Sequence, residues 1–280
     1  MASTQKTTPI TAISRLRTLL RQGSTRPTKM VVHKLRTTIR RIETALDRVE
    51  PKSTRLGKQL KRIRKGAGQV RDIDVQLTML DALHRNRDKS VIAVATKLKG
   101  MREKQERKVK KIIAEELDSG LNKRLRNASA DIAPAELAAN IDLAAIAREF
   151  SEISRHEQLT EKNLHPFRTE TKKLKYRAEL AAGSEKRDQL LAELKNVQDV
   201  IGSWHDAVTL SETAAKVLGN SKQNSLISIL RAQNHGRFLE AVRRVEQARR
   251  SVPELFNSAP AKKPVRSEPS SEFRRRSVGA

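Results

Sequence analysis

The chain has 280 residues, of which 37% are hydrophobic, so it can bury a sizeable core. Its 58 lysine and arginine residues exceed its 32 acidic residues, and the resulting net charge of +26 calls for an anionic partner. The absence of cysteine excludes disulfides, thiolate metal sites and cysteine nucleophiles.

Neither a membrane span nor a secretory signal is recognisable in the sequence. A span needs about eighteen or more consecutive apolar residues, and no such run occurs. We therefore expect a soluble, cytoplasmic protein without a membrane partner. The Ser/Thr/Arg-rich start, in which the first acidic residue is Glu43, leaves organelle targeting open as an alternative.

Apolar residues recur at intervals of three and four along most of the chain, as in Leu35, Ile39 and Ile42. This spacing predicts an all-α protein, and no segment alternates as a strand would. In chain order the predicted helices cover residues 10–22, 27–49, 53–84, 89–118, 134–154, 158–182, 187–217 and 222–250. We expect interruptions around Gly66 to Gly68 and around Gly202.

Composition divides the chain into a helical domain with two short ends. Residues 1–8 are predicted to be a flexible N-terminus, and residues 9–256 a helical domain with halves at about 9–119 and 134–256. From residue 257 to 280 the chain is rich in Ser, Pro, Ala, Lys and Arg, which predicts a disordered basic tail. A loose end and an extra electrostatic tether are both compatible with this tail.

A motif occurs twice along the chain. His33 to Arg41 and His165 to Lys173 share a histidine, a basic residue three positions later and two more at seven and eight positions. Downstream, the segments Leu60 to Asp72 and Leu194 to Asp206 also match in spacing, each with an internal glycine. Two ordered motifs in both halves indicate a tandem duplication.

Helical geometry places the basic residues of the first motif on one face and the apolar residues on the opposite face. The apolar stripe packs the bundle and leaves the basic face for solvent or a ligand. Like charges one turn apart repel each other, and a chain of phosphates would offset that repulsion. These face residues are His33, Arg36, Arg40 and Arg41, and His165, Arg168, Lys172 and Lys173.

Carboxylates accompany the second motif in each half. Asp72 and Asp206 end it, and Asp74 follows the first of them. We interpret them as orienting Arg71, His205 or an arginine of a facing helix, while ordinary surface salt bridges or helix caps are the alternative.

Four blocks of the sequence resemble the CHAD family, the conserved-histidine α-helical domain. They are Val32–Arg41, Gly68–Val75, Leu164–Tyr176 and Leu194–Gly202. The resemblance implies two helical bundles of long antiparallel helices related by pseudo-twofold symmetry. It also implies a central basic groove that binds inorganic polyphosphate, and a location at polyphosphate granules.

The candidate polyphosphate-binding residues are His33, Arg36, Arg40, Arg41, Lys61, Arg71, His165, Arg168, Lys172, Lys173, Lys175, Lys195 and His205, supported by Asp72, Asp74, Tyr176 and Asp206. At Lys175 the family pattern often has arginine, whose guanidinium fork a lysine lacks. As ligands the histidines would add charge only when protonated, so we expect binding to take up protons below neutral pH.

We expect binding without catalysis, cofactor or metal. The sequence has no E-x-E-x-K signature of a fused tripolyphosphatase and no H-E-x-x-H metal motif. Histidine phosphotransfer or metal chemistry at His33 or His165 is the less favoured alternative, and a scaffold that recruits acidic proteins is another. Non-specific binding of nucleic acid through its backbone is the stronger rival, although 2% aromatic residues argue against base stacking.

Overall fold

A computed structural model describes residues 9–49, 54–85, 87–131, 141–155, 158–219 and 224–257. Within these ranges every regular element is a helix, which confirms the all-α prediction. None of the described helices has the apolar length that a bilayer crossing requires. The N-terminus predicted for residues 1–8 and the tail predicted beyond residue 257 lie outside the described residues.

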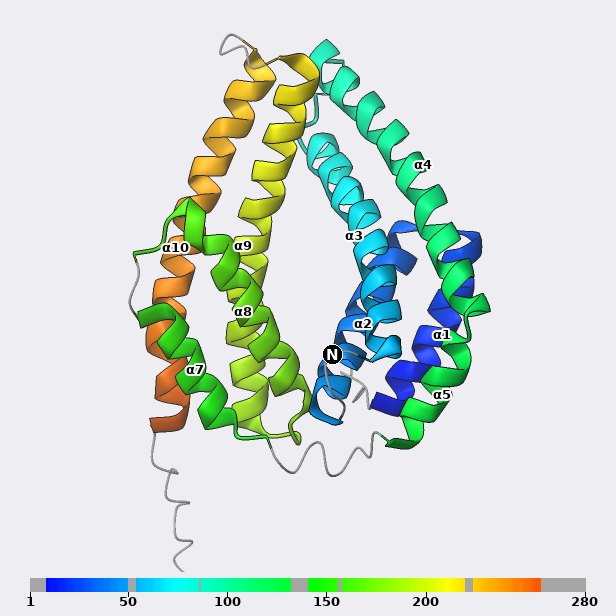
Figure 1. Ribbon diagram of the computed structural model, residues 1–280. Helices are drawn as coiled ribbons and strands as arrows, with labels where there is room; N and C mark the ends of the chain where they lie inside the picture. Colours follow the sequence, from blue (N-terminus) through cyan, green and yellow to red (C-terminus); the bar gives the residue numbers. More distant parts are fainter. Residues whose placement is uncertain are drawn as a thin grey trace, which may run out of the picture.

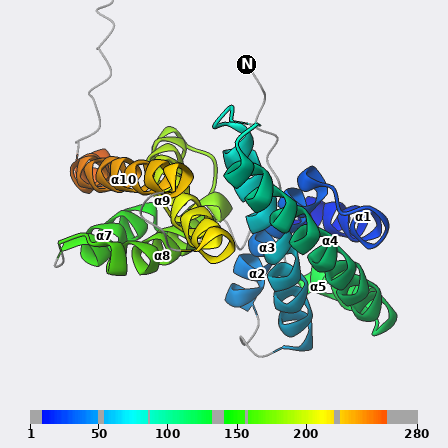
Figure 2. The same cartoon turned by 90° about the horizontal axis from the view of Figure 1, so that it is seen from above.

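The helices form two bundles. The first bundle comprises α1 (Pro9–Thr25), α2 (Lys29–Val49), α3 (Arg55–Asp81), α4 (Lys89–Asp118) and α5 (Leu121–Asp131). The second comprises α7 (Leu143–Arg155), α8 (Glu161–Leu180), α9 (Glu185–Leu218) and α10 (Ser225–Asn257). Figure 1 shows two groups that converge at one end, and Figure 2 shows them side by side from above.

Side-chain caps determine where several helices begin. Thr54 accepts a hydrogen bond from the backbone N–H of Gly57 at 3.1 Å and so starts α3. Asp88 accepts from the N–H of Ser90 at 2.8 Å at the start of α4. Each cap satisfies an N–H that has no partner within its helix and stabilises the fold by about 1 kcal/mol.

Each bundle has its own apolar core. Leu35, Ile39 and Ile42 are buried in the first core, which confirms the face predicted for the first motif. In the second core, the rings of Phe150 and Phe167 meet edge to face, with centroids 5.9 Å apart. Because each helix turns its apolar stripe into its own bundle, the polar faces of α2, α3, α8 and α9 are left to meet between the bundles.

A third apolar cluster joins the two bundles where they converge. Residues at the ends of α3 and α4, among them Leu80 and Leu98, pack with Leu210 of α9 and with Leu226 and Leu230 of α10. All five side chains are essentially excluded from solvent. This junction holds the bundles together at one end (Figure 1).

The predicted interruptions at the glycines are wrong, because α3 and α9 run unbroken through Gly66 to Gly68 and Gly202. A glycine weakens a helix, but tertiary packing outweighs that cost here. At Gly66, a Cβ would lie 3.1 Å from Cδ1 of Ile112, so the missing side chain lets α3 and α4 approach closely.

Between the two predicted halves, 9–119 and 134–256, the chain forms the helix α5. Leu121 and Leu125 of α5 are completely buried in the first core, so this segment belongs to the first bundle. Of the helix predicted over residues 134–154, the structure describes α7 from Leu143; residues 141 and 142 are not helical, and residues 132–140 lie outside the described ranges.

The joining cluster supplies a test of the fold. Leu98→Ala removes a fully buried side chain from it and should lower the free energy of unfolding by about 2–5 kcal/mol. On the same helix Ile92 is 49% exposed, and Ile92→Ala should change stability by less than about 0.5 kcal/mol. Urea unfolding measures the free energy of unfolding of both variants, and equal losses would contradict the stabilising role of this junction.

Candidate functional site

Five candidate cations meet between the bundles, and we call them the central cation cluster. Arg36 and Arg40 come from α2, Arg71 from α3, and Arg168 and Lys172 from α8. Burial, followed by the charges of the four arginines, lowers the pKa of the Lys172 ammonium to about 7. The sequence placed these residues on separate helix faces, and the fold brings the faces together.

Two of the arginines lie across a glycine of the neighbouring helix. A Cβ at Gly68 of α3 would lie 2.2 Å from Nη1 of Arg36, and a Cβ at Gly202 of α9 would lie 2.9 Å from Nη2 of Arg168. Any larger residue would therefore push the guanidinium away. The same arrangement in both bundles explains why each repeat contains a glycine, although the duplication itself stays a prediction.

An ion pair between the bundles closes one end of the cluster. The guanidinium of Arg71 in α3 donates to both carboxylate oxygens of Asp206 in α9, at 2.9 and 3.0 Å. Arg71 also reaches Asp72 at 3.3 Å. Burial lowers the pKa of Arg71, but the hydrogen bonds and charges of these carboxylates outweigh it and raise the pKa overall. Arg71 is thus already engaged.

A second ion pair between the bundles closes the other end. Nε of Arg41 in α2 donates to Glu179 in α8 at 2.8 Å, and Lys175 contacts the other oxygen of Glu179 at 3.0 Å. Burial raises the pKa of Glu179, but Arg41 and Lys175 outweigh it and keep the carboxylate ionised. Arg41 therefore links α2 to α8 across the two bundles, and Lys175 supports the same carboxylate from within α8.

Between these bridges, four cations lack counterions. The side chains of Arg36, Arg40, Arg168 and Lys172 form no hydrogen bond or ion pair within the described part of the chain, and Nε of Arg168 is buried without any partner. Burial lowers the pKa of Arg36 and of Arg168, and neighbouring arginines add to this effect, while the more distant charges of Asp72 and Asp206 oppose it only in part. The four residues are half-buried, and partly desolvated charges without partners cost stability, so this arrangement favours an anion with several charges.

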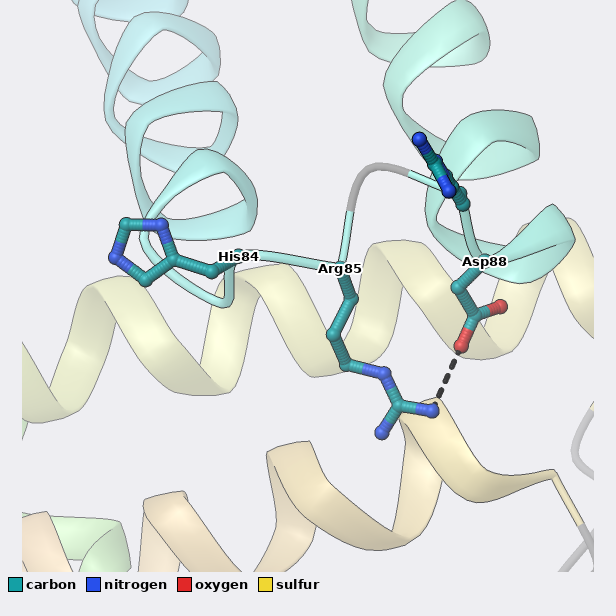
Figure 3. A pocket seen from close by; sticks show the side chains of 4 residues that line it. His84, Arg85 and Asp88 are labelled. Carbon is teal, nitrogen blue, oxygen red and sulfur yellow. Dashed lines mark ion pairs between the residues drawn. The ribbon is translucent and has the colours of Figure 1, made fainter.

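A shallow hollow lies elsewhere, at the turn between α3 and α4 (Figure 3). Its volume is about 540 Å³, and it is lined by His84, Arg85, Arg87 and Asp88. Arg85 already pairs with Asp88 at 3.1 Å. The hollow contains no residue of the central cation cluster, so we take the cluster as the candidate site.

Comparison with known families now identifies the fold. A model of the CHAD domain matches residues 11–215, most of the chain. The chain belongs to the CHAD domain family. No curated protein matches its sequence significantly.

Solved structures agree with this assignment at the level of the fold. The CHAD domain from the plant Ricinus communis superposes with a TM-score of 0.60 at 15% identity, covering 88% of this chain and 90% of that one. PptA from Streptomyces chartreusis superposes with a TM-score of 0.55 at 14% identity, covering 90% and 98%.

The histidines of this CHAD domain lie at the edge of the cluster. The rings of His165 and His205 contact each other with centroids 4.5 Å apart and planes tilted by 43°. Burial first, then Arg168 among the neighbouring cations, lowers the pKa of both. Burial and the charge of Arg71 also lower the pKa of His33. Proton uptake by these histidines stays a prediction, and the lowered pKa values move it further below neutral pH.

Tyr176 supports the cluster from α8. Burial raises its pKa, so its hydroxyl stays protonated and can donate a hydrogen bond to a phosphate oxygen. Nζ of Lys175 lies 5.4 Å from the centre of the Tyr176 ring.

Three of the predicted polyphosphate-binding residues of this CHAD domain are not part of the central cation cluster. Lys173 pairs with Glu170 and Lys195 with Asp199, both at 2.7 Å and both exposed. Lys61 is also exposed.

Asp74 pairs with an arginine of a facing helix, as one interpretation expected, but not with the cluster. Its partner is Arg102 of α4, at 2.9 Å. Sequence reasoning missed Glu179, for which the one signal was its position four residues after Lys175 on the same helix.

The lowered pKa of Lys172 has a predictable effect on stability. Since this pKa is about 7 in the folded state and 10.5 ordinarily, the unfolded state binds more protons between these values, and stability should rise with pH across that window. Lys172→Met should therefore stabilise the protein relative to the wild type most at pH 6, with a gain that shrinks toward pH 10. Denaturant unfolding at several pH values measures this.

Lys173→Met is the control, because Lys173 is exposed on the same helix and paired with Glu170. Its effect on stability should be small and vary little with pH. A Lys172→Met effect that stays constant from pH 6 to 10 would contradict the prediction.

Proposed function

We propose that this chain binds inorganic polyphosphate at the central cation cluster and catalyses no reaction. The observation that carries the proposal is the set of cations without counterions, Arg36, Arg40, Arg168 and Lys172, gathered from both bundles. Membership of a family in which some proteins bind polyphosphate supports the choice of ligand.

A phosphate chain suits these cations chemically. A guanidinium donates two parallel hydrogen bonds to phosphate oxygens, and Nε of Arg168 is buried with no other acceptor. Lys172 supplies a point charge. A bound anion would stabilise the ammonium form of Lys172, whose pKa is lowered without it. Binding several phosphates also releases their condensed counterions, so affinity should fall steeply with salt.

The cellular role follows from the ligand. A polyphosphate-binding protein in the cytoplasm would be retained at polyphosphate granules, and we propose this location. Storage, sensing and scaffold roles all use the same surface.

Backbone binding of nucleic acid is the second candidate function. Lys97, Lys104, Arg107 and Lys108 are exposed on α4, a helix that contributes no residue to the central cation cluster. Phosphate contacts of this kind need only charge and no aromatic stacking. These four residues also offer a matched control for the main test.

Replacing Arg36, Arg40, Arg168 and Lys172 together with alanine should abolish polyphosphate binding. At roughly 1.5–3 kcal/mol for each charged hydrogen bond, the loss of affinity should exceed about 100-fold. Fluorescence competition with long-chain polyphosphate at physiological salt measures it, with circular dichroism as a check that the helices persist.

The control for this variant replaces Lys97, Lys104, Arg107 and Lys108 with alanine, which removes the same net charge from α4. Polyphosphate affinity should fall by less than about tenfold, because only long-range attraction is lost. Equal losses in the two variants would move the site away from the cluster. Displacement of polyphosphate by duplex DNA at equal phosphate concentration would favour the nucleic-acid function.

A second prediction uses the glycine beneath Arg36. Gly68→Ala should weaken polyphosphate binding without unfolding the protein, because the new Cβ displaces only the flexible end of Arg36. We expect about a tenfold loss of affinity, equivalent to about 1.4 kcal/mol.

Gly100→Ala in α4 is the control, since a Cβ there meets no atom within 4 Å. It should gain about 0.5–1 kcal/mol of stability from helix propensity and leave binding unchanged. Thermal unfolding and titration with polyphosphate distinguish the two variants, and full affinity in Gly68→Ala would refute the prediction.

A further inference from the structure

Two carboxylates lie among the cations of the site, one from each bundle. Asp72 follows Gly68 by four residues on α3, and Asp206 follows Gly202 by four residues on α9, so each lies one turn beyond the glycine that an arginine covers. A carboxylate repels a polyanion and weakens its binding, so the presence of these aspartates in the proposed site needs an explanation.

The two aspartates are held differently. Asp206 is 14% exposed and receives both hydrogen bonds of the Arg71 fork. The residue of α9 that corresponds to Arg71 is His205, which offers no such fork to Asp72. Asp72 is 52% exposed and has one contact with Arg71, at 3.3 Å. Asp206 is therefore built into the interface, whereas Asp72 is accessible and weakly held.

Asp72 nevertheless affects the pKa of two arginines of the central cation cluster. Burial lowers the pKa of Arg36, and Asp72 is the largest influence that opposes it. For Arg168, burial again comes first, and Asp206 and Asp72 both oppose it. The carboxylate of Asp72 thus partly offsets the positive charge that an anionic ligand would neutralise.

We propose that Asp72 is a selectivity residue, a resident carboxylate that polyphosphate overcomes and that less charge-dense polyanions do not. The inference rests on the proposed function. Consecutive phosphates of polyphosphate share one bridging oxygen, so several can reach Arg36, Arg168 and Lys172 together. In a nucleic acid a sugar separates consecutive phosphates, so fewer reach the cluster against the same repulsion from Asp72.

The test compares Asp72→Asn with Asp199→Asn. Both substitutions remove one negative charge, but Asp199 is exposed on α9 and pairs with Lys195 outside the cluster. Dissociation constants for long-chain polyphosphate and for duplex DNA are measured at physiological salt for the wild type and each variant. The ratio of the two constants is the measure of selectivity.

In Asp72→Asn, DNA binding should tighten about tenfold and polyphosphate binding by less than about threefold, since like-charge repulsion falls most for the ligand that could not overcome it. Asp199→Asn should leave the ratio unchanged within about twofold, because its charge is screened from the site. Asp72→Glu keeps a carboxylate and should keep the wild-type ratio, which separates the effect of charge from that of altered packing.

Equal shifts of the ratio in Asp72→Asn and Asp199→Asn would overturn the inference, as would loss of selectivity in Asp72→Glu. Either result leaves the proposed function intact if the wild type still binds polyphosphate. Failure of the wild type to bind polyphosphate would overturn the proposed function itself.

Discussion

Positively charged side chains meet between the two helical bundles, and they repel one another. The rest of the structure depends on this constraint, because other contacts must hold the bundles together. Arg36, Arg40, Arg168 and Lys172 repel one another, so they cannot hold the bundles together. Cohesion comes instead from the apolar junction at the converging ends of the bundles and from two ion pairs between them. The contacts that hold the bundles together are therefore different from the cations at which we propose that a ligand binds.

The ion pairs also bound the site. Asp206 and Glu179 engage Arg71 and Arg41, so these two arginines bridge the bundles, and the cations between them remain without counterions. Burying charge without a partner costs stability, and the lowered pKa of Lys172 expresses that cost. A polyanion that enters the cluster would offset it, which couples ligand binding to stability of the folded protein.

Glycine has a positional role in this arrangement. Gly68 and Gly202 lie inside long helices, where glycine is unfavourable, yet each gives an arginine of the neighbouring helix the space to lie against the backbone. The local conflict between propensity and structure coincides with the candidate site, and such conflicts are common at functional positions.

The sequence by itself determined the helices and the faces they present, because helical periodicity is a local property of neighbouring residues. It placed Leu35 and Ile39 in the core and His33, Arg36 and Arg40 on the opposite face. It could not tell that α3 and α9 pass unbroken through their glycines, because that depends on contacts with other helices. Nor could it show which cations are neutralised. Arg71 and Asp206 are 135 residues apart, and Arg41 and Glu179 are 138 apart. Only the tertiary structure decided that these pairs meet while Arg36, Arg168 and Lys172 form no ion pair with a described carboxylate, since an ion pair depends on distance in space and not on spacing along the chain.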